Sequence, residues 1–148
     1  RGRAEHADLA LTQRVVERLN GDIWRERRVR EHHIQLVDRE LAASVEIERR
    51  EKRIGASLEA APTVSVKDKA VRDQLASVDF ADLCITSGVT IKAGAGPKDA
   101  FRLDEVEGVA VVPTMAEGEK CQRCWKILPD VGSHKHEGVC GRCDEALK

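Results

Sequence analysis

Four of the five cysteines stand in two Cys-x-x-Cys pairs, Cys121/Cys124 and Cys140/Cys143, with fifteen residues between the pairs. Each pair can turn two sulfur atoms toward one centre, and four thiolates complete the ligand set of a tetrahedral structural Zn²⁺. A shell of four sulfurs leaves no open position at which the metal could activate water. The spacing therefore predicts one zinc ion per chain with a structural role.

The alternative interpretation of these cysteines is two disulfides or unrelated thiols. Basic residues surround the cysteines and no secretory signal opens the chain, which favours a metal site over a disulfide framework. Trp125 directly follows Cys124, and we expect its ring to cover the sulfur cluster in place of a larger core. Since the metal supplies about 10–16 kcal/mol of apparent folding energy in zinc-finger peptides, this end of the chain should be unfolded without it.

The composition limits the classes of protein to which the chain could belong. A length of 148 residues allows one compact domain or two small ones. The net charge of −1 and pI near 6.6 argue against a globally basic nucleic-acid binder, so such contacts would come from local patches. No apolar run approaches the roughly 18 residues of a membrane span, so we expect no membrane partner. A zinc site in place of a disulfide framework indicates a cytoplasmic location. The chain begins with Arg1 rather than Met, and we expect it to be a fragment of a longer protein.

The elements that must position the cysteines begin with a charged helical segment over residues 1–57. We expect a first helix ended by Asn20-Gly21 and a second one capped by Asp22, because Asn-Gly is a common helix terminator. Apolar residues predict one buried stripe on each helix, and on the second helix they recur at spacings of three and four. These residues are Leu9, Val15, Val16 and Leu19 on the first helix and Ile34, Val37, Leu41 and Val45 on the second.

The pattern changes over residues 58–116, where short β-like runs predict a small mixed α/β junction module. Asp68 is expected to cap a short helix whose Val71 and Leu75 face inward. We expect Cys84 to be a buried small hydrophobe within a strand. The predicted strands are Thr63–Val66, Leu83–Ile85, Val89–Ile91 and Val109–Val112.

Residues 117–148 form the expected four-cysteine zinc finger. The fold class predicted for the whole chain is α+β, with an N-terminal helical segment, the small mixed α/β junction module and the C-terminal zinc finger. Six residues near the cysteines could meet nucleic acid, the cations through phosphates and the indole by stacking. They are Lys120, Arg123, Trp125, Lys126, Lys135 and Arg142. The alternative role of Arg123 and Arg142 is to neutralise the sulfur cluster.

The order of motifs in the last hundred residues resembles the C-terminal region of bacterial isoleucyl-tRNA synthetases. The string Gly-Glu-Lys-Cys-Gln-Arg-Cys-Trp at 118–125, with Asp-Val-Gly at 130–132 and Cys-Gly-Arg-Cys at 140–143, is similar to their extreme C-terminus. The strings at 51–60 and 82–87 are similar to the segments before it in the same order. The resemblance covers about residues 46–148, and residues 1–45 are either the preceding helical anticodon-binding region or a divergent extension.

This resemblance implies a non-catalytic, zinc-binding part that supports recognition of isoleucine tRNA, with the remainder of the synthetase as a partner. The HIGH and KMSKS signatures of adenylate formation are absent from the chain, so ATP would be used only by a catalytic domain elsewhere. We expect the chain alone to be inactive in aminoacyl-adenylate formation.

Formamidopyrimidine-DNA glycosylases carry a similar finger, with an Arg inserted into DNA from the loop between the cysteine pairs. Residues 125–139 contain no Arg, and the chain lacks the N-terminal proline nucleophile of those enzymes, so DNA is the less favoured partner. A protein-binding zinc ribbon is the other alternative.

Overall fold

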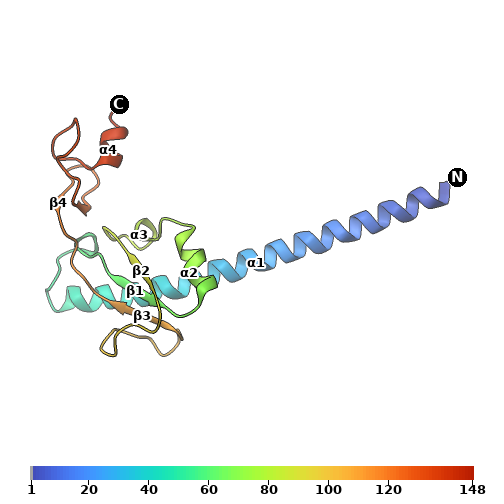
Figure 1. Cartoon of the computed structure of the whole chain (residues 1–148), viewed down its shortest axis with the longest axis horizontal. Coiled ribbons are helices and arrows are strands. Elements are labelled where there is room, and N and C mark those ends of the chain that lie inside the picture. Colours follow the sequence, from blue (N-terminus) through green and yellow to red (C-terminus); the bar gives the residue numbers. More distant parts are fainter. Residues whose placement is uncertain (1) are drawn as a thin grey trace. The chain divides into compact units, whose positions relative to one another are not determined.

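The computed structural model describes the backbone of residues 2–148 and the side chains of residues 18, 21–23 and 25–148. The chain contains helices, one three-stranded sheet, one two-stranded sheet and the four-cysteine segment at its C-terminal end (Figure 1), which confirms the predicted α+β class. Residues 1–33 and 34–148 are two separate compact units. Among the described residues, none of the helices combines the length and the apolarity that crossing a membrane requires.

The charged N-terminal segment forms one helix, α1, over Gly2–Arg50. The predicted break at Asn20-Gly21 is wrong, because both residues lie inside the helix. Glycine can adopt helical dihedral angles at a cost of roughly 1 kcal/mol relative to alanine, which one position in a long run of helix formers can absorb. The predicted stripe of Leu9, Val15, Val16 and Leu19 lies outside the residues whose side chains are described.

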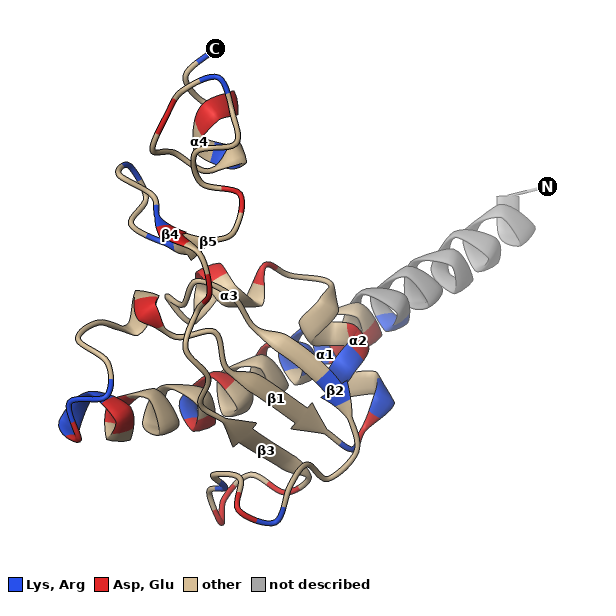
Figure 2. Ribbon diagram, turned by 60° about the vertical axis from the view of Figure 1, so that its left-hand side comes forward, with Lys and Arg blue, Asp and Glu red and all other residues tan. Residues whose placement is uncertain are grey.

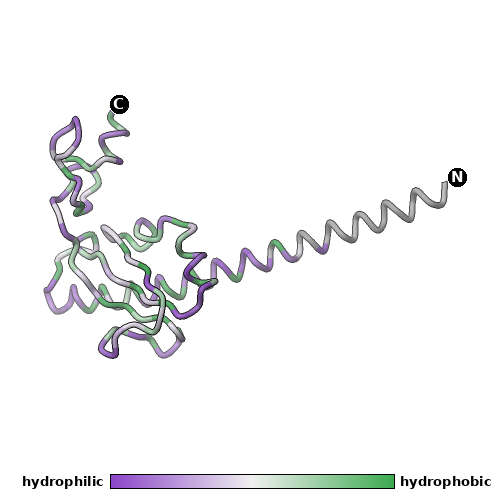
Figure 3. The backbone as a smooth tube through the Cα atoms, in the orientation of Figure 1, coloured by the Kyte–Doolittle hydropathy of each residue, from purple (hydrophilic) through white to green (hydrophobic). Residues whose placement is uncertain are grey.

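The second predicted stripe of α1 is confirmed within residues 34–148. Val37, Leu41 and Val45 are almost completely buried, and Ile34 is at the edge of the same core. They pack in one cluster with residues of the sheet, including Val64 and Val111. The apolar residues of this unit appear in Figure 3 as green segments on the last turns of α1 and on the strands. Apart from Phe80, the buried residues of this core are aliphatic.

The sheet of the junction module has the strand order β2-β1-β3 and mixed direction. The central strand β1 (Thr63–Val66) pairs in parallel with β2 (Thr90–Ala93) and antiparallel with β3 (Val109–Val112) (Figure 2). Val64 stands opposite Ile91 on one side and Val111 on the other. A short 3₁₀ turn, Ser57–Glu59, leads from α1 into β1. The predicted strands at 63–66, 89–91 and 109–112 are confirmed within one or two residues.

Helix α2 (Lys69–Ala76) lies in the crossover between the two parallel strands. Asp68 caps it as predicted, since its Oδ1 accepts the N–H of Ala70 at 2.7 Å. Leu75 is fully buried, and Val71 packs against the core from a partly exposed position. Parallel strands need such a crossover, which explains why a helix interrupts the β-like sequence here.

The predicted strand Leu83–Ile85 is wrong, because helix α3 spans Phe80–Leu83 and Cys84 is its C-cap. Asp79 caps α3 through the N–H of Asp82 at 3.1 Å, and Phe80 is anchored in the core. Ile85 then adopts a left-handed φ of 55°. A three-residue apolar run does not distinguish a strand from a helix end, and here the capping aspartate decides. Cys84 is partly buried against the core as a helix-end residue.

A carboxylic acid lies in the core between α1 and the loop that precedes β3. The Glu40 side chain is fully buried, and its Oε1 accepts the N–H of Leu103 at 3.3 Å. Its Oε2 and the Oγ of Ser44 one turn later are buried without a hydrogen-bond partner among the described residues. Burial raises the pKa of Glu40 to about 7, although the Leu103 N–H and the charge of Arg102 oppose this shift.

This raised pKa predicts a dependence of stability on pH that one substitution should remove. The unfolded carboxyl titrates near 4.5 and the folded one near 7, so unfolding releases a proton between these values and stability falls as pH rises through them. Glu40→Gln cannot ionise, and its stability relative to wild type should be about 2–3 kcal/mol greater at pH 8 than at pH 5. Denaturant unfolding followed by circular dichroism measures this difference.

Glu105→Gln is the matched control, because Glu105 is exposed and pairs with Arg39 at the surface. Comparison of the variants at each pH cancels the pH dependence of the rest of the chain. An equal gain for Glu40→Gln at pH 5 and pH 8 would show that Glu40 is ionised in the folded protein.

Candidate metal centre

The first Cys-x-x-Cys pair lies in the turn of a small hairpin. Strands β4 (Glu119–Lys120) and β5 (Ile127–Leu128) pair antiparallel on either side of it. Cys121 donates its N–H to the carbonyl of Lys126 at 2.8 Å, and the N–H of Trp125 returns to the carbonyl of Cys121 at 2.9 Å. These bonds and the left-handed φ of Trp125, 67°, form a tight turn that places Cys121 and Cys124 on the same side of the hairpin.

The second pair is held at the start of the short helix α4 (Gly141–Glu145). Cys140 is the residue that precedes this helix, and Cys143 lies in its first turn. The N–H of Asp144 donates to the carbonyl of Cys140 at 2.9 Å, which fixes the spacing of the two cysteines along the turn. The helical turn therefore presents both sulfurs toward the hairpin.

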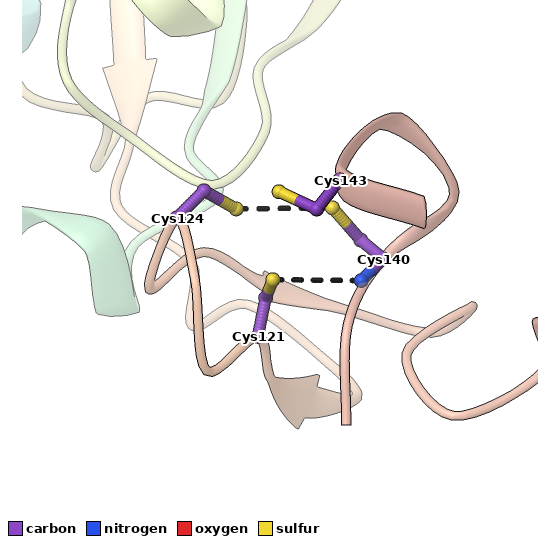
Figure 4. A group of neighbouring side chains, drawn as sticks. All are labelled: Cys121, Cys124, Cys140 and Cys143. Atoms are coloured by element: carbon purple, nitrogen blue, oxygen red, sulfur yellow. Dashed lines mark hydrogen bonds between the residues drawn. The ribbon is translucent and has the colours of Figure 1, made fainter. Parts of the chain in front are cut away.

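The four sulfur atoms converge from these two elements (Figure 4). All four lie within 4.8 Å of one another, and three of the four residues are buried. The Sγ atoms of Cys124 and Cys140 are 3.7 Å apart. A tetrahedron with metal–sulfur bonds of about 2.3 Å has edges of about 3.8 Å, so this separation suits Zn²⁺. None of the five cysteines is in a disulfide, and Cys84 lies outside the cluster.

The local backbone makes one thiol of the cluster unusually acidic. Burial disfavours the Cys121 thiolate, but the N–H groups of Cys124, Cys140 and Arg123 outweigh it and lower the pKa of Cys121 to about 6. The N–H of Cys140 donates to this sulfur at 3.4 Å. Burial instead raises the pKa of Cys124 to about 12. A bound cation would favour the thiolate at both positions, which is the form that coordinates metals.

Two aspartates hold the loop between the cysteine pairs, and sequence reasoning missed both. Asp130 Oδ2 accepts the N–H of Gly141 at 2.8 Å and contacts Nε2 of His134 at 3.0 Å. Asp144 Oδ1 accepts the N–H of His136 at 2.9 Å and contacts its Nδ1 at 2.8 Å. Hydrogen bonding lowers the pKa of both aspartates, with the backbone N–H groups as the largest cause. The spacing of four residues between Asp130 and His134 was the available signal in the sequence.

The apolar cover of the cluster differs from the one predicted. Val139, Leu128 and Val131 pack against the cysteines. Trp125, which was expected to cover the sulfurs, is 61% exposed, and the ammonium of Lys120 lies 5.3 Å from the centroid of its ring. The left-handed backbone at Trp125 accompanies this outward placement.

The six predicted nucleic-acid contacts fall into two groups. Lys120, Arg123, Lys135 and Trp125 are exposed on the metal module, which we define as residues 117–148. Lys126 and Arg142 are instead engaged with the Asp82 carboxylate of α3: Lys126 contacts Oδ1, and Arg142 Nη1 donates to Oδ2 at 2.5 Å. Local sequence patterns do not identify this partner, because Asp82 precedes the two cations by 44 and 60 residues.

Comparison with known proteins gives one family match and a set of close relatives. Residues 118–146 match the family described as "Zinc finger found in FPG and IleRS". The chain is 65% identical over 107 residues to the isoleucine–tRNA ligase of Ruegeria pomeroyi, a match that covers 72% of the chain and 11% of the relative. It is 50% identical to the corresponding ligases of Brucella abortus over 100 residues and Agrobacterium fabrum over 109 residues. These two matches cover 68% and 73% of the chain and 10% and 11% of the relatives, so the chain spans about a tenth of the length of the curated proteins that it matches.

The hairpin of the metal centre depends on a glycine at its entrance. Gly118 has a φ of +118°, and a Cβ atom there would stand 2.3 Å from the carbonyl oxygen of Leu128. Gly132 also has a positive φ, +83°, but open space around it. We expect Gly132→Ala to cost about 1–2 kcal/mol and Gly118→Ala about 1–3 kcal/mol more, because only the latter must also separate two backbone segments.

Amide hydrogen exchange of Cys121 and Trp125, in zinc-containing buffer, measures this difference, because both N–H groups are bonded within the hairpin. Equal exchange in the two variants would show that the close approach of Gly118 to Leu128 does not hold the hairpin together.

Proposed function

From the similarity of this chain to part of isoleucine–tRNA ligases, we propose that it is a non-catalytic, zinc-binding part of such a ligase that contributes to binding of isoleucine tRNA. The observation that supports it most directly is the convergence of four sulfurs within the segment that matches the family model. The identity of the relatives favours a ligase over a DNA glycosylase, although the zinc-finger family is found in both. A cytoplasmic location and a role in protein synthesis belong to the same proposal.

One Zn²⁺ per chain, bound by Cys121, Cys124, Cys140 and Cys143, is the structural part of this proposal. The buried sulfurs and the spacing of 3.7 Å between two of them support a closed four-thiolate site. When bound, the ion supplies folding energy rather than catalysis. Asp130 and Asp144 would keep the loop of the finger ordered around it.

Elemental analysis of the purified chain tests the metal site. We expect about one zinc per chain in wild type and clearly less in Cys124→Ser, because a three-sulfur shell is incomplete. Cys84→Ser is the matched control, since this cysteine lies outside the cluster, and it should keep the wild-type content. An equal zinc content of Cys124→Ser and wild type would show that Cys124 is not a zinc ligand.

The exposed residues of the metal module would form the contact with RNA. Lys120, Arg123 and Lys135 carry positive charge at its surface, and Trp125 offers an indole beside Lys120. Phosphate contacts and base stacking are the two ways in which such side chains bind single-stranded or loop RNA. Lys126 and Arg142 have a smaller role in this proposal because both already pair with the Asp82 carboxylate. The Arg49–Arg53 region at the end of α1 supplies further cations, mainly Arg50 and Lys52, because Arg49 pairs with Glu46 and Arg53 with Glu48.

Titration of labelled isoleucine tRNA at several salt concentrations separates the two kinds of contact. Lys135→Ala should lower the slope of log affinity against log salt by about one unit, because one phosphate contact is lost. Trp125→Ala should cost about 1–3 kcal/mol with little change in that slope. Lys69→Ala is the control, since this lysine pairs with Asp73 on α2 and should bind as wild type does.

Three outcomes would count against the RNA assignment. Absence of binding at low salt, or identical affinity of all variants, would leave the module as a structural element alone. Equal binding of a DNA duplex would instead favour the glycosylase-type alternative.

A further inference from the structure

The Asp82 carboxylate joins the two halves of the metal module to the junction module. Lys126 follows Cys124 by two residues and contacts Oδ1, whereas Arg142 directly precedes Cys143 and donates to Oδ2 at 2.5 Å. The two oxygens of Asp82 therefore bind one cation beside the first cysteine pair and one cation within the second. Figure 2 shows α3, the helix that carries Asp82, next to the hairpin of β4 and β5.

The Lys126 arm of this contact is more enclosed than an ordinary surface ion pair, whereas the Arg142 side chain is 73% exposed. The side chain of Lys126 is only 16% exposed and that of Asp82 only 33%, so the charges have lost much of their hydration. An ammonium in such a place is costly unless a carboxylate compensates it. Removal of Asp82 would therefore leave Lys126 either buried without a counter-charge or displaced into solvent.

A second contact beside the ion pairs also holds the hairpin against the junction module. The N–H of Ile127, next to Lys126, donates to Ser87 Oγ at 2.7 Å, and this hydroxyl donates to the carbonyl of Leu58. Ile85 lies between Asp82 and Ser87 and has a left-handed φ of 55°, which is rare for a β-branched residue. Such a conformation persists where surrounding contacts determine it. Segment 80–88, which we call the docking segment, thus carries both Asp82 and Ser87, the residues that contact Lys126 and Ile127.

The two cations that meet at Asp82 are carried by the two elements that also hold the sulfur cluster. Lys126 belongs to the hairpin and Arg142 to α4, and the cysteines are the main buried residues that join these two elements. An ion bound to all four sulfurs would fix the distance between Lys126 and Arg142, whereas the free segment would have no comparable constraint. A carboxylate that binds both cations at once is therefore sensitive to the state of the four sulfurs.

We propose that Asp82 is a positioning residue that couples zinc binding to docking of the metal module on segment 80–88. This proposal rests on the zinc site proposed above. Because coupling between two binding events is reciprocal, loss of Asp82 weakens zinc binding just as loss of zinc weakens docking. Lys126 and Arg142 then serve to orient the module, and its exposed face, with Lys120 and Trp125, is held in a fixed relation to the rest of residues 34–148.

Competition of the whole chain with a chromophoric zinc chelator measures the first half of this coupling. We expect Asp82→Asn to bind zinc about tenfold more weakly than wild type, with one equivalent still bound at saturation. Asp73→Asn is the matched control: it makes the same chemical change on α2 in an exposed pair with Lys69. Its zinc affinity should equal that of wild type.

Amide hydrogen exchange measures the effect of zinc on docking of the metal module. If Asp82 had only a structural role, zinc would not change the protection of the docking segment. In wild type, zinc should increase protection of Cys84, Ile85 and Thr86, whose N–H groups are bonded within the docking segment. In zinc-saturated Asp82→Asn this increase should be lost, while residues 121–143 remain protected. Lys126→Met should reproduce the effect and add little to it in the double variant, because both changes remove the same contact.

The outcomes separate the coupling from the zinc site itself. If wild type binds no zinc, the proposed function fails. If wild type binds zinc but Asp82→Asn binds it equally tightly and keeps the zinc-dependent protection, only the coupling is overturned. If Asp82→Asn does not fold, the comparison of Lys126→Met with wild type decides in the same way.

Discussion

The metal module depends on the contact among its four sulfur atoms more than on any other interaction. Its strands are two residues long and α4 has five residues, so hydrogen bonds alone cannot make them stable. Only three partly or fully buried aliphatic residues support the cysteines. Without an ion, four thiolates held this close would repel one another, and four thiols would attract one another only weakly. The folded state of residues 117–148 therefore depends on what binds the four sulfurs.

The junction module is stabilised in a different way and gives the metal module a fixed support. Its core packs the last turns of α1 against Val64 and Val66, which share one face of β1, the strand with a partner on each side. Segment 80–88 follows α2 and precedes β2 in the chain. Phe80 anchors it in the core, and Ser87 anchors it to the carbonyl of Leu58 in the 3₁₀ turn before β1. A module with almost no apolar core thus rests on one that has a conventional core.

Sequence reasoning succeeded where the determining interactions are local. The Asp68 cap, the stripe from Ile34 to Val45 and the Cys-x-x-Cys turns involve residues within a few positions of each other, and the structure contains all of them. It failed at Leu83–Ile85, where Asp79 and the buried Phe80 select a helix end, and at Trp125, where a left-handed backbone accompanies the exposed ring. The partner of Lys126 and Arg142 lies far away in sequence, and composition around the cysteines could not identify it.

The strand β2 lies at an edge of its sheet, where a strand of a second molecule could pair with it. At the opposite edge, β3 is covered by Phe101, which exchanges two backbone hydrogen bonds with Val111. Within residues 34–148, β2 has β1 as its one strand partner, and three of its four residues are exposed. Open edges invite intermolecular strand pairing and aggregation. The short length of β2, the charge of Lys92 and the Gly94–Pro97 turn that ends it oppose such pairing, so this edge can stay in water without starting a fibril.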